Sequence, residues 1–170
     1  MREQLVSATI VVLVLTARIA SAGEWREVSS REGGFSVLMP GDPVVSLYGG
    51  EVLMNLQAQG AAFLVVTFNQ PPFEGDALAK LDRAKKESLQ QAKAAHMTLL
   101  AERDVSLPEV QGQELQLEDS NGAKHITRFY FNRARDRLVM VAVRGLPALP
   151  EDVSKKFLES FRFRPGAQPK

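Results

Sequence analysis

Apolar and polar residues alternate along several short segments of this chain, which is the pattern of half-buried β-strands. The clearest segment is FSVLMP, which places Phe35, Val37 and Met39 on one face of a strand and Ser36 and Leu38 on the other. Clusters of Gly and Pro separate the segments, as turns require. The pattern therefore predicts a sheet of short strands. Besides residues 35–40, strands are predicted at residues 25–28, 44–48, 51–59, 98–107 and 161–164.

Residues 112–144 are predicted to form a three-stranded antiparallel meander, to which the other strands add. Its strands read GQELQLED, KHITRFYFN and RLVMVAVR. Asn121-Gly122 joins the first two, and Asn-Gly suits a two-residue type I′ loop because both positions tolerate positive φ. An acidic strand then faces a basic one, which favours the pairing. In this register the opposed pairs are Asp119 with Lys124, Glu118 with His125, and Leu115 with Arg128.

Two strands lack the alternation and are apolar almost throughout, at residues 61–69 and 138–143. Strands of that kind are covered on both faces. Three- and four-residue apolar spacing predicts a long helix that begins after the N-cap Asp76 and ends near His96, and a short second helix opens at Pro150. The expected fold class is α+β: an antiparallel sheet of about six to eight strands with helices covering both faces, an α/β/α sandwich.

Composition narrows the classes of partner and chemistry. The chain has 170 residues, enough for one domain, and 21 Lys and Arg against 20 Asp and Glu. This balance supplies no strong field to hold nucleic acid or an anionic membrane. Because cysteine is absent, disulfides, thiolate metal ligands and cysteine nucleophiles are excluded.

The first 22 residues have the pattern of a secretory signal. A short start containing Arg2 precedes an apolar run from Leu5 to Leu15, and Ala20-Ser21-Ala22 is a small-x-small cleavage pattern ending at Ala22. The run is shorter than the roughly 20 residues that span a bilayer. Cleavage near Ala22 is the main interpretation, and an uncleaved anchor is the alternative. The expected layout is a signal peptide at 1–22, one domain at 23–164 and a disordered tail at 165–170.

Three features together resemble the PsbP-like superfamily of small extracytoplasmic bacterial proteins. They are the opening W…GGFSVLMPGDP, the helix beginning at Asp76, and the closing FLESFRF. The same superfamily holds the Ran-binding nuclear import factors. The resemblance implies one PsbP-like domain with an antiparallel sheet between helix layers. It transfers no site residues to this chain.

No catalytic, cofactor-binding or metal-binding residues are predicted. The two histidines, His96 and His125, lie far apart in the sequence, with His96 at a helix end and His125 expected to face Glu118. No G-x-S-x-G elbow and no Gly-rich phosphate loop before a helix is found. No cofactor is expected.

Four arginines are the candidate ligand or partner contacts. Arg128 lies in mid-strand between Ile126 and Tyr130, so it is either a structural arginine reaching a carboxylate or an anchor for a carboxylate ligand in a helix–sheet cleft. The others surround the second meander turn, which is either a docking patch or a solvated hairpin tip. They are Arg133, Arg135 and Arg137.

These observations indicate an exported, non-catalytic accessory or binding protein, periplasmic or secreted after signal removal. Its expected partner is a protein or a small ligand in the cell envelope, with no nucleic acid and no stable membrane span. The alternatives are a hydrolase-type enzyme with an unrecognised site and a membrane-tethered version of the same binding domain.

Overall fold

The structure of the protein, a computed structural model, describes residues 24–69, 75–108, 110–145 and 148–164. The predicted signal segment with its cleavage position at Ala22, and the predicted tail at 165–170, lie outside the described residues. Among the described residues, no helix is long and apolar enough to cross a membrane.

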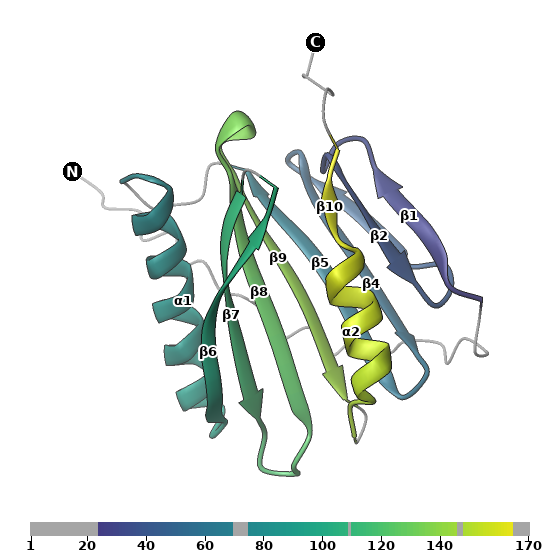
Figure 1. Ribbon diagram of the computed structural model, residues 1–170, viewed down its shortest axis with the longest axis vertical. Helices are drawn as coiled ribbons and strands as arrows, with labels where there is room; N and C mark the ends of the chain where they lie inside the picture. The colour runs from purple at the N-terminus through teal and green to yellow at the C-terminus, as the bar shows by residue number, and fades with distance from the viewer. Residues whose placement is uncertain (1–23, 70–74, 109, 146–147, 165–170) are drawn as a thin grey trace.

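The described part of the chain forms two α-helices and ten strands (Figure 1). The helices are α1 (Ala77–Ala94) and α2 (Glu151–Ser160), and a 3-10 turn covers Arg133–Arg135. The strands are β1 (Arg26–Ser30), β2 (Phe35–Met39), β3 (Val44–Tyr48), β4 (Glu51–Ala58), β5 (Ala61–Asn69), β6 (Thr98–Leu107), β7 (Val110–Glu118), β8 (Lys124–Asn132), β9 (Arg137–Gly145) and β10 (Arg162–Phe163).

Seven strands form one antiparallel sheet in the order β3-β4-β5-β9-β8-β7-β6. The meander predicted from the sequence is its β7-β8-β9 portion, and β5 joins it by pairing with β9 over its whole length. The other three strands form a separate small sheet, β1-β2-β10, in which the first and last strands of the domain both pair with β2.

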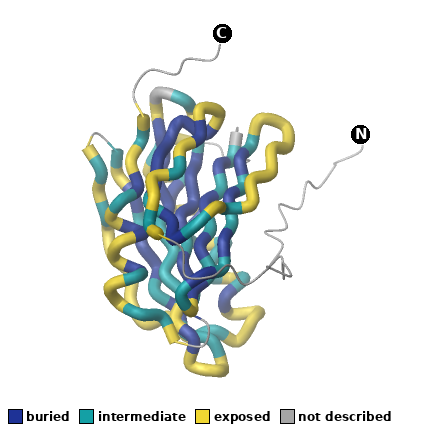
Figure 2. The backbone as a smooth tube through the Cα atoms, turned by 90° about the vertical axis from the view of Figure 1, so that its right-hand side faces the viewer, coloured by how far each residue is buried: buried dark blue, intermediate teal, exposed yellow. Residues whose placement is uncertain are grey.

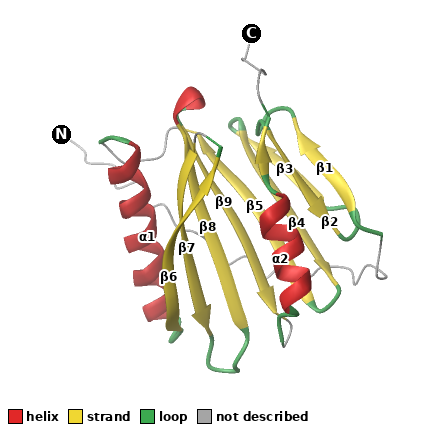
Figure 3. Cartoon of the chain, viewed as in Figure 1, coloured by secondary structure: helices red, strands yellow, loops and turns green. Residues whose placement is uncertain are grey.

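The large sheet is covered on both faces, as predicted (Figure 3). Along β5, Phe63 and Val65 enter a core with α2 and the small sheet, whereas Leu64 and Val66 pack toward the core beneath α1. Buried residues accordingly run through the central strands (Figure 2). The fold is thus α+β with helices on both faces, and the small sheet shares one face with α2.

Helix α1 begins where its cap predicts. The Asp76 side chain accepts a hydrogen bond from the Ala79 backbone N–H at 2.9 Å, which satisfies a donor that has no partner within the helix. Leu81, Ala84 and Ala92 form its buried stripe, and the small alanines let the helix approach strands β7 and β8 closely.

The predicted two-residue loop between β7 and β8 is wrong. Only Gly122 takes a positive φ there (79°), and the strands end at the pair Glu118–Lys124. The Asp119 carboxylate accepts from the backbone N–H groups of Asn121 and Ala123 at 2.9 and 3.0 Å, which holds a longer turn. Every opposed pair is therefore shifted by one residue.

An aromatic cluster joins the two sheets. The Phe161 ring lies 5.5 Å from the Phe35 ring of the small sheet and stacks on the Tyr130 ring of β8, also at 5.5 Å. The Tyr130 ring in turn covers Gly112 on the neighbouring strand, where an added Cβ would fall 2.5 Å from the ring and from the Phe129 carbonyl oxygen. Gly112 therefore makes room for the ring that connects the layers.

Candidate functional site

The shifted register places Arg128 opposite Glu114, not opposite Leu115. Arg128 Nε donates to Glu114 Oε2 at 2.7 Å, and Arg103 Nε on β6 donates to Glu114 Oε1 at 2.7 Å. The Glu114 side chain is fully buried, whereas Arg128 is 12% and Arg103 58% exposed. The carboxylate is thus shared between one enclosed and one solvated guanidinium.

Glu114 stays ionised in this position. Burial alone would favour the protonated acid, but hydrogen bonds from Arg103, Gln116 and Arg128 outweigh it and lower the pKa of Glu114. Sequence reasoning missed this residue because a loop one residue too short put Leu115 in its place. The signal that could have found it is an acidic residue in the middle of β7, away from the strand ends, where a charged side chain needs a partner once the strand is covered.

Arg128 also ties the sheet to α2. Its Nη1 atom donates to the backbone carbonyl of Leu158 in the last turn of that helix, at 3.0 Å. A cation at this end complements the helix dipole. The structure thus shows the structural arrangement foreseen for Arg128, an arginine that reaches a carboxylate. Its use as a ligand anchor stays a prediction.

The three arginines of the second meander turn do not form one open patch. Arg137 donates to the Glu32 carbonyl oxygen, and the Arg135 guanidinium lies against Gly34, so both contact the β1–β2 turn. Burial, with the neighbouring charge of Arg135, lowers the pKa of Arg137. Of the three, Arg133 is exposed. Within the described residues, Arg135 and Arg137 of this turn therefore bind the small sheet. Arg133 is the arginine of the turn that is most accessible to a partner.

His125 does not face Glu118 as predicted; its opposite neighbour on β7 is Leu117. Its Nε2 atom lies 3.4 Å from Asp119 Oδ2, and Arg144 Nη2 donates to the same oxygen at 2.8 Å. Backbone hydrogen bonds from Ala123 and Asn121 lower the pKa of Asp119 to about 2. Burial lowers the pKa of His125. The ionised Asp119 carboxylate, through His125 and Arg144, therefore connects the β7–β8 hairpin to β9.

Strand β3 is one edge of the large sheet and is exposed along its whole length. Its four large apolar side chains are between 48% and 86% exposed, and none of its five residues is charged. They are Val44, Val45, Leu47 and Tyr48. A contiguous apolar edge of this kind is typical of a protein-binding surface.

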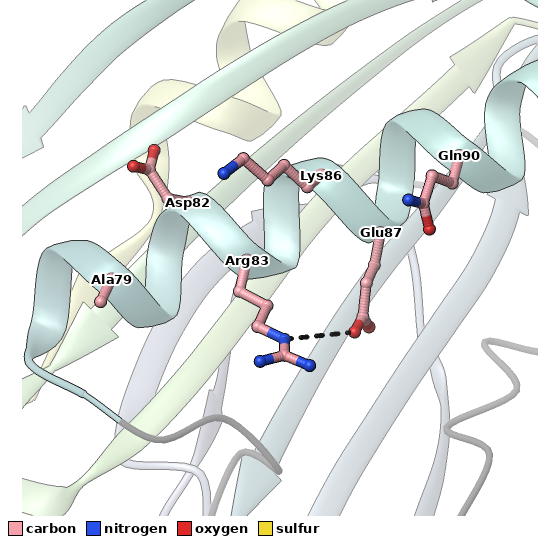
Figure 4. A pocket seen from close by; sticks show the side chains of 6 residues that line it. All are labelled: Ala79, Asp82, Arg83, Lys86, Glu87 and Gln90. Atoms are coloured by element: carbon pink, nitrogen blue, oxygen red, sulfur yellow. Dashed lines mark ion pairs between the residues drawn. The ribbon is translucent and has the colours of Figure 1, made fainter.

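An open hollow of about 540 Å³ lies on the solvent side of α1 (Figure 4). Arg83 Nε and Glu87 Oε1 lie 3.9 Å apart along it. The other lining residues are Ala79, Asp82, Lys86 and Gln90. The sites predicted from the sequence lie elsewhere, so this hollow is not the expected helix–sheet cleft. Among the described residues, no group of three or more His, Asp or Glu is placed to hold a metal ion.

Comparison with known proteins shows similarity of fold to solved structures. No protein-family model matches this sequence, and no curated protein matches it. The fold is similar to that of the Ran-binding protein Mog1p from Saccharomyces cerevisiae, with 8% identity, TM-score 0.51, and 83% of this chain and 96% of that chain covered. It is also similar to cyanobacterial PsbP (CyanoP) from Synechocystis sp. PCC 6803, with 14% identity, TM-score 0.54, and 89% and 98% covered. The resemblance inferred from the sequence is thereby confirmed for the fold.

Proposed function

We propose that this protein is an exported accessory protein that binds another protein through strand β3 and catalyses no reaction. The observation that carries the proposal is the uncharged, apolar and exposed β3. Leaving such a strand in water has a cost that a partner removes, since burying apolar area yields about 25 cal/mol per Å². Of the arginines singled out earlier, Arg128, Arg135 and Arg137 are engaged in contacts within the domain, whereas Arg133 is exposed.

Two further observations support the proposal. Residues 1–22 carry the charged start, apolar run and small-residue cleavage pattern of an export signal. The fold is similar to that of the Ran-binding protein Mog1p. Fold likeness alone assigns no partner to this chain.

Site-specific photo-crosslinking in the producing cell tests the binding surface. A photoreactive phenylalanine analogue replaces Tyr48 on β3, and a matched variant carries it at Gln90, which is exposed on α1. We expect a discrete protein adduct from position 48 and none from position 90. Equal labelling at both positions, or none at position 48, would refute binding through β3.

The mass of the protein recovered from the cell envelope tests export. We expect a chain that begins at Gly23, which corresponds to cleavage after Ala22. A full-length chain held in the membrane fraction would favour the tethered alternative. A full-length chain in the cytoplasm would contradict export.

A further inference from the structure

The two edges of the large sheet differ in how they meet solvent. Strand β6 carries the consecutive charged residues Glu102, Arg103 and Asp104, and its pairing with β7 is interrupted by an irregularity between Leu99 and Ala101. Charges and bulges are the devices that keep an edge strand from pairing with another chain. Strand β3 has neither: its five residues VVSLY pair with β4 in unbroken register and carry no charge. One edge is therefore protected and the other is left open to strand addition.

Strand β3 is complementary to itself. Antiparallel pairing of two copies about Ser46 aligns all five residues, with Ser46 opposite Ser46, Val45 opposite Leu47, and Val44 opposite Tyr48. These are β-branched, aliphatic and aromatic pairs with a central serine pair, which are combinations that stabilise neighbouring strands. A two-fold axis through Ser46 generates this arrangement, and such isologous contacts are the commonest route to dimers.

Each pair also falls on one face of the sheet. Val45 and Leu47 lie opposite Met54 and Val52 of β4, so they share the α2 face. Both remain exposed there, which means that the small sheet leaves this margin of β3 accessible. A second copy can therefore continue the sheet on this side.

Charge does not oppose the contact. Removing Arg2, Arg18 and Glu3 with the signal leaves 19 basic and 19 acidic residues, from 21 and 20. Two copies of a chain with formal charge near zero repel each other little.

We propose that the partner of β3 is a second copy of this protein, paired antiparallel about Ser46 to give a two-fold symmetric dimer with one continuous sheet. This inference rests on the proposed binding role of β3 and names its partner.

Cysteine crosslinking tests the register, and the absence of natural cysteine makes it unambiguous. Directly opposed residues of antiparallel strands have Cα atoms about 4.5–5.5 Å apart, within the range of a disulfide. In the protein isolated from the envelope, we expect S46C to give a disulfide-linked dimer as the main product of mild oxidation. V44C is the matched control, because in this register the two introduced residues lie about 13 Å apart. The double variant V44C/Y48C should crosslink again.

Sedimentation of the wild-type protein and of Leu47→Lys completes the test. We expect a dimer that the exposed lysine converts to a folded monomer with an unchanged circular dichroism spectrum. A monomeric wild type, or S46C and V44C crosslinking equally, would overturn the dimer. If the wild type is monomeric while position 48 still captures a different protein, self-pairing fails and the proposed function stands. If position 48 captures nothing and the wild type is monomeric, both fail.

Discussion

At the scale of single residues, the buried carboxylate Glu114 connects three strands and a helix. It accepts hydrogen bonds from Arg103, Gln116 and Arg128, and Arg128 continues to the carbonyl of Leu158. Two arginines share this carboxylate but differ in exposure, so removal of Glu114 would leave Arg128 enclosed and Arg103 solvated without their partner. An enclosed charge without a partner is costly, whereas a solvated one is not.

The first prediction compares the two sides of this cluster. Glu114→Ala leaves Arg128 enclosed without its counter-charge and should lower the free energy of unfolding by about 3–5 kcal/mol. Arg103→Met removes the solvated partner and should cost less than about 1 kcal/mol. Urea denaturation of both variants measures the difference. Equal losses would show that the Arg103 contact accounts for the whole contribution of Glu114, which would contradict the cost assigned to the enclosed Arg128.

The second prediction concerns pH. Burial lowers the pKa of His125 below its ordinary value of 6.5, so the unfolded chain takes up a proton before the folded one does. The resulting stability is present above pH 6.5 and is lost as the pH falls from there toward the lowered pKa. His125→Gln should reduce this slope, as measured by urea midpoints between about pH 7.5 and pH 5. A variant that keeps the full slope would assign it to another group.

Asp119 acts in a separate, more acidic window. Its folded pKa of about 2 lies below the ordinary 3.8, so its contribution is present above 3.8 and is lost as the pH falls toward 2. The range used for His125 therefore does not include it.

At the scale of elements, alternation and unbroken apolar runs were enough to predict the strands, and one turn was enough to misplace the register between β7 and β8. The segment 35–39 alternates and is a strand; residues 61–69 do not alternate and form a strand covered on both faces. The N-cap Asp76 also predicted the start of α1. The turn failed because Asp119 supplies its side chain to backbone N–H groups of the loop, which local propensity does not reveal. The partner of Arg128 was missed as a direct consequence.

The third prediction uses two glycines that the fold needs for different reasons. At Gly122 an added Cβ meets nothing within 4 Å. Gly122→Ala should therefore lower the free energy of unfolding only through the strain of its positive φ, by about 1 kcal/mol. At Gly112 the Cβ collides with the Phe129 carbonyl and the Tyr130 ring, so Gly112→Ala should cost about 2–3 kcal/mol. Thermal unfolding of the two variants ranks them. The reverse order would contradict the close approach at Gly112.

At the scale of the whole molecule, the small sheet is attached to the large one by aromatic rings and by the arginines of the second meander turn. The apolar periodicity could predict each strand of the small sheet. It could not predict that these three strands form a sheet of their own, because β2 pairs with β1 and with β10, which lie at opposite ends of the domain. The contacts of Arg135 and Arg137 with the β1–β2 turn depend on this arrangement of the two sheets, so they could not be predicted from the local sequence pattern.

The fourth prediction tests the joint between the sheets. Phe161 is fully buried between Phe35 and Tyr130, so Phe161→Ala should lower the free energy of unfolding by about 3–5 kcal/mol. Leu78→Ala, at an exposed position of α1, is the matched control and should change it by no more than about 0.5 kcal/mol. Chemical denaturation measures both. A small loss at Phe161 would mean that the sheets hold together without it.

The pairing of β2 with β10 has a consequence for how the chain is made. Strand β2 is synthesised early. Its partner strand β10, and the Phe161 ring that contacts the Phe35 ring, leave the ribosome more than a hundred residues later. Until then β2 lacks both the strand that completes the small sheet and the ring that contacts Phe35. The small sheet of the nascent protein consequently stays incomplete until β10 emerges, because the contact that closes this sheet joins residues distant in the sequence.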